Sequence, residues 1–378
     1  MGEEDLERRG SMRRRSSSSS KGVHPVHDSG APVYLPVSQG RRWIPLLIPT
    51  IVVANIVMFI ITMYVNNCPA NTANDQCLAK FLKRFSFQPF SENPLIGPST
   101  RALQQVGALD TNKVVHDHQG WRLVSCMWLH AGVIHLVANM LSLLVIGIKL
   151  EQEFGFLKIG LIYLLSGLGG SLLSSLFLQN RISVGASGAL FGLLGAMLSE
   201  LITNWSIYES KCGALFTLIV VVAVNLAVGI LPHVDNFAHI GGFIVGFLAG
   251  FVLLLLPQRE YVNLATAAPG QLVQRKRHKP YQCVLLVIAL ILLIAGMSVT
   301  MVLVLRGVDG NDKCSWCHYL SCVPTSRWNC DDAGVASCTT VQTGDTLQVT
   351  CVSNNQTTLT AANQSNSVLE SLCAQLCN

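Results

Sequence analysis

The chain has 378 residues, of which 50% are apolar and only 12% carry a charge. Because soluble domains usually contain about 25% charged residues, this composition excludes an ordinary soluble protein and indicates a protein of the lipid bilayer. The formal net charge of +5 is small, and we expect no nucleic-acid partner.

Seven predominantly apolar stretches of about 18 residues or more follow one another along the chain. Lipid offers no hydrogen-bond partner to backbone N–H and C=O groups, so each stretch must form a helix rather than an isolated strand. We therefore predict an all-α, polytopic membrane protein with six core helices and a seventh, C-terminal transmembrane helix. The stretches cover residues 43–65, 123–148, 156–178, 185–202, 213–231, 237–256 and 284–305.

Basic residues and cysteines predict the same orientation of the chain in the membrane. Arginine and lysine cluster before the first stretch and, at 275–279, before the seventh, so the positive-inside bias places both segments in the cytosol. Seven crossings then put the C-terminus on the lumenal or extracellular side. Cys68, Cys77 and the eight cysteines after the last stretch fall on that side, where disulfides persist.

The pairing of the tail cysteines cannot be read from the sequence, because eight cysteines allow too many combinations. The Cys-x-x-Cys pair Cys314 and Cys317 resembles a zinc-ligand pair, but an oxidising compartment favours a disulfide. Glycosylation sequons begin at Asn355 and Asn363 in the same tail. A third begins at Asn204, on the cytosolic side, where it should remain unmodified.

A serine lies at the start of the fourth stretch, in the string Gly185-Ala186-Ser187-Gly188. This stretch is among the shortest, so its helix is expected to begin below the membrane surface, with free amide groups and the positive end of the helix dipole beside Ser187. A serine in that position suits a nucleophile. The alternative is a small-residue packing surface, which membrane helices often use.

A histidine, His239, lies near the start of the sixth stretch, on the same predicted side and at a similar depth as Ser187. Small residues on both stretches allow the two helices to cross closely, which would bring Ser187 and His239 into hydrogen-bond reach. We therefore predict a Ser–His dyad. The small residues are Gly188, Gly192 and Gly195 on the fourth stretch and Ala238, Gly242 and Gly246 on the sixth.

Other roles for His239 are a packing residue, a metal ligand or part of a proton path. A metal site is disfavoured because no set of carboxylates or cysteines completes it at this depth, so we expect no metal and no other cofactor. Asp235, one turn earlier, is a candidate third member of a triad, but a helix cap or a solvated charge is favoured.

The second stretch contributes His130, His135 and Asn139, of which the last two share a helix face. Imidazole and amide groups, with the backbone amide of Ser187, suit the stabilisation of an oxyanion. A structural hydrogen-bond cluster is an equal alternative for His130 and a weaker one for Asn139. Phe191 lies one turn after Ser187, where its ring either packs against His239 or belongs to the core.

In order and helix placement these residues resemble the rhomboid intramembrane serine proteases, over roughly residues 43–306. The string 91–98, SENPLIGP, and the cysteine-rich tail are similar to plant members in particular. The matching motifs are Trp121-Arg122, His130 with His135 and Asn139, Gly185-Ala186-Ser187-Gly188, and His239 with Gly242 and Gly246.

The resemblance implies a serine endopeptidase that cleaves single-pass membrane proteins in or beside their transmembrane segment, with water admitted from the lumenal side. Ser187 would be the nucleophile, His239 the base, and His135 and Asn139 part of the oxyanion hole. Phe191 stands where the family often has tyrosine. The Trp121-Arg122 pair would brace the first loop at the membrane interface.

The expected partners are the bilayer and transmembrane substrates with helix-weakening residues, and the plant-like features favour the Golgi within the endomembrane system. A non-proteolytic adaptor that binds transmembrane clients for trafficking or degradation is the alternative function, although inactive relatives typically lack the serine or the histidine. A transporter is disfavoured because no inverted repeat is evident.

The sequence predicts five consecutive regions and an ordered first loop. The loop 66–122 is mixed in character, so we expect an amphipathic element packed on the bundle at the interface. The regions are a disordered cytosolic tail at 1–42, the six-helix catalytic core at 43–256, a cytosolic linker at 257–281, the seventh transmembrane helix at 282–306 and a lumenal cysteine-rich tail at 307–378.

Overall fold

A computed structural model gives the fold of the chain. It describes residues 43–71, 77–179, 181–205, 210–228, 234–263, 272–314, 316–321, 338–344, 346–351, 356–362 and 366–376. The predicted N-terminal tail and the sequon asparagines Asn355 and Asn363 lie outside these ranges. The chain divides into two compact units, one of residues 1–38 and 260–275 and the other of residues 39–259 and 276–378.

Apolar helices dominate the second unit. In the described ranges, five helices are long and apolar enough to cross a membrane, namely α1, α6, α7, α10 and α11, and α8 and α9 are shorter apolar helices. A helix therefore occupies each predicted apolar stretch. The bounds are α1 Leu47–Asn66, α6 Val133–Phe154, α7 Phe156–Phe177, α8 Ser187–Thr203, α9 Lys211–Val228, α10 Asn236–Leu253 and α11 Pro280–Leu305.

The second apolar stretch differs from the predicted single helix over 123–148. Two short helices, α5 Arg122–Ser125 and η3 Cys126–Trp128, come first, and α6 begins only at Val133. The loop before α6 is held by the first long loop, because Asn93 Nδ2 donates to the Ala131 carbonyl at 2.8 Å and the Val133 amide donates to the Ile96 carbonyl at 2.9 Å. These bonds replace helical ones, so His130 lies before the helix and not within it.

The prediction of an all-α chain holds for the membrane-spanning part and is wrong for the tail. There β4 Thr346–Cys351 pairs antiparallel with both β3 Cys338–Thr343 and β5 Thr357–Ala361, and α12 Asn366–Leu376 follows. The predicted linker contains a two-stranded sheet, β1 Gln258–Asn263 and β2 Leu272–Arg277. Short strands without a long apolar run carry no signal in a search for spans.

The described parts of the first loop, residues 66–71 and 77–122, pack on the bundle, as the mixed character of the loop predicts. Its buried side chains include Leu103 and Leu109, each of which belongs to a cluster of buried apolar residues. Other apolar side chains of the loop are exposed, namely Phe81 at 83% and Phe90 at 59%. Its short helices are α2 Cys68–Asn71, η2 Lys80–Phe85, α3 Thr100–Val106 and α4 Thr111–Val115.

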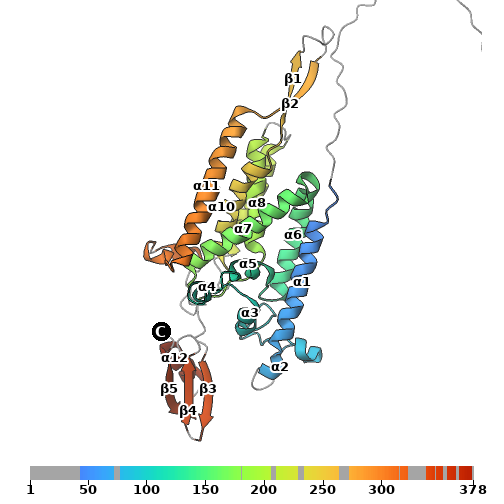
Figure 1. The fold of residues 1–378 in the computed structure, drawn as a ribbon. Coiled ribbons are helices and arrows are strands. Elements are labelled where there is room, and N and C mark those ends of the chain that lie inside the picture. The colour runs from blue at the N-terminus through green and yellow to red at the C-terminus, as the bar shows by residue number, and fades with distance from the viewer. Residues whose placement is uncertain are drawn as a thin grey trace, which may run out of the picture. The chain divides into compact units, whose positions relative to one another are not determined.

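The helices α7, α8 and α10 lie side by side in the middle of the bundle (Figure 1). Their contact surfaces are lined by glycine, because a Cβ atom at Gly192, Gly242 or Gly246 would overlap atoms of the facing helix. Close approach of this kind maximises van der Waals contact between helices in lipid, where no hydrophobic force drives association.

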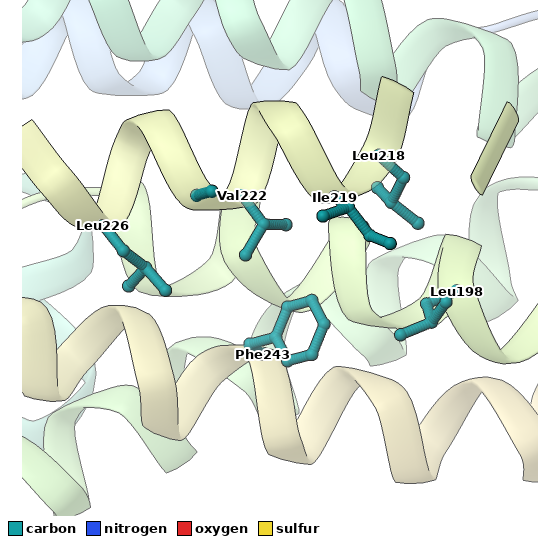
Figure 2. A pocket seen from close by; sticks show the side chains of 7 residues that line it. Leu198, Leu218, Ile219, Val222, Leu226 and Phe243 are labelled. Carbon is teal, nitrogen blue, oxygen red and sulfur yellow. The ribbon is translucent and has the colours of Figure 1, made fainter. Parts of the chain in front are cut away.

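One cavity of about 220 Å³ lies between α8, α9 and α10 (Figure 2). None of the predicted site residues lines this cavity, and its walls are wholly apolar. It marks looser packing of α9 against its neighbours. The lining residues are Leu198, Leu218, Ile219, Val222, Ala223, Leu226 and Phe243.

Cysteine oxidation follows the predicted division of the chain. Disulfides join Cys68 to Cys77, Cys314 to Cys317 and Cys338 to Cys373, and Cys351 is disulfide-bonded as well. The free thiols in the described ranges are Cys126, Cys212 and Cys283, all outside the segments predicted to be oxidised. The Cys314–Cys317 pair is thus a disulfide and not a pair of zinc ligands.

Candidate active site

Ser187 is the first residue of α8, which is the shortest of the apolar helices at 17 residues. The turn before it requires glycine, since Gly185 has a φ of +135° and a Cβ atom there would lie 2.9 Å from His135 Nε2. The Gly185 amide donates to the Cys126 carbonyl at 3.0 Å, which anchors the turn. Ser187 therefore sits half-buried at a helix N-terminus, beside free amide groups.

The start of α8 and the start of α10 are in direct contact. A Cβ atom at Gly188 would lie 3.1 Å from the Ala238 carbonyl oxygen, and one at Gly242 would overlap the Gly188 carbonyl. The predicted crossing of these helices is confirmed, and it makes the residues next to Ser187 and His239 neighbours. In the described structure no hydrogen bond joins Ser187 Oγ to His239.

His239 is only 6% exposed and is held from two sides. The Phe191 ring stacks on its imidazole with centroids 4.2 Å apart and an interplanar angle of 10°. In addition, the ring nitrogen Nδ1 of His239 lies 3.2 Å from Asn236 Oδ1. The packing of Phe191 against His239 is one of the two arrangements considered for this ring, whereas the contact with Asn236 was not foreseen.

Asp235 caps α10, and among the described residues its hydrogen bond with His239 is a backbone one, in which the His239 amide donates to the Asp235 carbonyl at 3.3 Å. The Asp235 carboxylate makes no hydrogen bond with the His239 ring in the described structure. Its carboxylate accepts hydrogen bonds from the Ala238 amide at 2.9 Å, from Ser174 Oγ at 2.5 Å and from Ser183 Oγ at 2.6 Å. Burial raises the pKa of the Asp235 carboxyl, and the hydrogen bonds from both serines oppose that rise. The residue thus ties α10 to α7 and to the segment before Ser187, as a cap and not as a triad member.

His135 and Asn139 present donors from α6. The Ala131 amide donates to His135 Nδ1 at 3.4 Å, so in the neutral ring Nε2 carries the proton and faces the Gly185 turn. Asn139 is 6% exposed, and its Nδ2 has no hydrogen-bond partner among the described residues. Two donors, one of them unpaired, therefore lie on one face of α6.

His130 supports His135 from the preceding loop. It is fully buried, and its ring packs edge-on against the His135 ring with centroids 5.3 Å apart. Neither ring nitrogen of His130 has a partner among the described residues. His130 therefore packs behind His135, and its predicted role, as an oxyanion donor or as part of a hydrogen-bond cluster, stays a prediction.

Arg122 braces the first loop. Its guanidinium is buried and donates to the carbonyls of Gln104 at 2.8 Å and Ala108 at 2.7 Å, while the Trp121 ring lies 4.8 Å from its centre. These bonds satisfy two loop carbonyls that face the bundle. The Trp121-Arg122 pair thus ties the 104–108 part of the first loop to the start of α5.

Fold and site together define a polytopic membrane protein in which a serine, two histidines and an asparagine are gathered among apolar helices. The sequence pattern of the Rhomboid domain matches residues 117–256. The chain belongs to the rhomboid family.

Relatives of known name extend over most of the chain. It is 58% identical to RHOMBOID-like protein 1 of Arabidopsis thaliana, with 89% of this chain and 87% of that protein covered. It is 53% identical to RHOMBOID-like protein 4 of the same plant, with 90% and 85% covered. A further relative, Inactive RHOMBOID-like protein 8, is 42% identical, with 76% and 83% covered.

Proposed function

We propose that this protein is an intramembrane serine endopeptidase in which Ser187 attacks the peptide bond and His239 takes its proton. The observation that supports the proposal is the contact between Gly188 and Ala238, which brings together the starts of the two helices that carry Ser187 and the buried His239. Serine and histidine are the side chains that a nucleophile and its base require. Membership of the rhomboid family supports the same assignment.

The reaction follows from the protonation states that the site favours. Ser187 Oγ attacks the carbonyl carbon while its proton passes to His239 Nε2, and the same proton then goes to the leaving amine. An acyl ester on Ser187 remains, which water hydrolyses with His239 again as base. The hydrogen bond between Ser187 and His239 forms in the complex with substrate, since such bonds often tighten only there.

Negative charge on the carbonyl oxygen is stabilised by three groups. The backbone amide of Ser187 lies at the positive end of α8, His135 Nε2 faces the same turn, and the unpaired Asn139 Nδ2 completes the set. A buried donor without a partner is costly, so its presence supports a functional role for Asn139. Phe191 keeps the His239 ring in place.

The substrates are proposed to be single-pass membrane proteins cut in or beside their transmembrane segment. The peptide bond must leave its helix before Ser187 can reach it, which favours substrates with helix-weakening residues. We place the N-terminus in the cytosol and the C-terminal tail in the lumen of an oxidising compartment, the Golgi being the proposed one. The disulfides of the first loop and the tail support that orientation.

Purified protein in detergent tests the proposal with a fluorogenic transmembrane substrate. We expect Ser187→Ala and His239→Ala each to abolish cleavage while the thermal midpoint stays within a few degrees of wild type. A fluorophosphonate should label the wild type and not Ser187→Ala. Cleavage by Ser187→Ala at the wild-type rate would overturn the assignment.

An adaptor that binds transmembrane clients without cutting them is the second candidate, because a relative named as inactive shares 42% identity with this chain. Both functions require binding of a transmembrane helix, and only the protease requires Ser187. Absence of fluorophosphonate labelling in folded wild-type protein, with capture of a transmembrane client in crosslinking, would favour the adaptor.

A further inference from the structure

Asn236 connects His239 to the C-terminal tail. It is the first residue of α10 and is 3% exposed. Its Oδ1 lies 3.2 Å from His239 Nδ1, and its Nδ2 donates to the Leu226 carbonyl at 3.0 Å and to the Leu320 carbonyl at 2.8 Å. One buried amide therefore joins the ends of α9 and α10 and the tail.

The chemistry of these partners fixes the orientation of the amide. Carbonyl oxygens only accept hydrogen bonds, so Asn236 must turn its NH₂ group toward Leu226 and Leu320 and its oxygen toward His239. An oxygen facing Nδ1 requires a proton on Nδ1. The neutral imidazole of His239 then has its free lone pair on Nε2, which is the form that a general base needs.

The carbonyl of Leu320 belongs to a loop at the start of the tail, which is held by a disulfide and by a hydrogen bond to α7. Leu320 ends the short helix η5 Cys317–Leu320, and the Cys314–Cys317 disulfide closes the turn that leads into it. The earlier part of the loop is tied to α7, because Asn311 Nδ2 donates to the Phe177 carbonyl at 2.8 Å. Phe177 in turn stacks on Phe237 of α10 with centroids 4.4 Å apart.

We propose that Asn236 is a positioning residue for His239, and that the tail loop closed by the Cys314–Cys317 disulfide holds Asn236 in the orientation that catalysis needs. This inference rests on the proposed protease function. It assigns to the start of the C-terminal tail a part in the active site, although the tail follows the last apolar helix.

The arrangement around His239 leaves Asn236 as the group that sets its tautomer. Phe191 covers one ring face and cannot accept an in-plane hydrogen bond. Asp235 uses its carboxylate on Ala238, Ser174 and Ser183. His135 lies on α6, and its Nδ1 is occupied by the Ala131 amide.

The substitution Asn236→Leu tests the first half of the proposal, because leucine has a similar size and no polar atoms. We expect kcat on a transmembrane substrate to fall about tenfold to a hundredfold with KM unchanged, since the base and not the substrate site is altered. Labelling of Ser187 by a fluorophosphonate should slow by a similar factor. A wild-type kcat in folded Asn236→Leu protein would overturn the proposal.

A pair of cysteine variants in the full-length protein tests the second half and does not depend on how well Asn236→Leu folds. Replacing both Cys314 and Cys317 with serine opens the turn before η5, and we expect kcat to fall at least about threefold with KM unchanged. The matched control replaces Cys338 and Cys373, which join β3 to α12, and should keep the wild-type kcat. Equal kcat values in the two double variants would overturn the role of the tail loop.

Failure of this inference can be told from failure of the proposed function. Cleavage that persists in Ser187→Ala contradicts the protease assignment itself. Cleavage that is lost in Ser187→Ala but unchanged in Asn236→Leu and in the Cys314, Cys317 double variant contradicts only the positioning role.

Discussion

The phenyl ring of Phe191 lies parallel to the imidazole of His239, with centroids 4.2 Å apart and planes inclined by 10°. Phe191 is one turn along α8 from Ser187, so the helix that carries the proposed nucleophile also carries the ring that restrains the proposed base. Any displacement of α8 against α10 therefore changes both residues together.

Substitutions of Phe191 test this restraint. Phe191→Tyr keeps the ring and should leave kcat within about twofold of wild type, whereas Phe191→Leu removes the stack and should lower kcat about tenfold, in line with the ~0.5–1.5 kcal/mol of an aromatic pair. Cleavage kinetics in detergent provide the measurement. A Phe191→Leu protein with wild-type kcat would show that the ring is only core packing.

The close crossing of α8 and α10 predicts intolerance to a methyl group. A Cβ atom at Gly246 would overlap the Gly192 backbone, so Gly246→Ala should destabilise the protein by about 1–3 kcal/mol and lower activity. Gly213→Ala in α9 is the control, because nothing lies within 4 Å of the added atom. Thermal unfolding in detergent compares the two, and an equal midpoint would contradict the tight crossing.

The start of α1 depends on a side chain of another helix. Glu151 of α6 accepts hydrogen bonds from the amides of Leu46 at 2.9 Å, Leu47 at 2.8 Å and Ile48 at 2.9 Å, where α1 has no cap of its own. Glu151→Gln replaces one accepting oxygen with a donor and should cost about 1–3 kcal/mol. Lys149→Gln, at an exposed position of the same helix, serves as the control, and a shift of the unfolding midpoint as large as that of Glu151→Gln would refute the capping role.

Thiol reactivity tests both burial and orientation. Burial raises the pKa of the Cys126 thiol to about 12, so at pH 8 the reactive thiolate is scarce and a maleimide should not modify it. Cys212 and Cys283 are exposed and lie in the first turns of α9 and α11, at helix ends that are predicted to be on the cytosolic side.

An impermeant maleimide added to sealed microsomes should therefore label Cys212 and Cys283 and spare Cys126. Cys126 should react at pH 8 only after denaturation, because its protection comes from the fold. Single-cysteine variants read by mass spectrometry resolve the three sites. Labelling of Cys212 or Cys283 only after the membrane is opened would reverse the proposed topology.

Local patterns in the sequence determined where the apolar helices lie and which polar residues interrupt them. Each of the seven predicted apolar stretches contains an apolar helix. The small residues of the fourth and sixth stretches predicted a close helix crossing, and Gly188 and Ala238 are in contact there. Such features are readable because burial in lipid and close helix packing each depend on residues within a few turns.

The tertiary structure alone decided which groups hold these residues in place. The bond from Asn236 to the Leu320 carbonyl spans 84 residues, and the cap of α1 by Glu151 spans more than 100. His130 lies before α6 and not in the predicted helix, because hydrogen bonds between the first loop and Ala131 and Val133 take the place of helical ones. Hydrogen bonds between distant segments leave no periodic trace in the sequence, so only the folded chain reveals Asn236 beside His239.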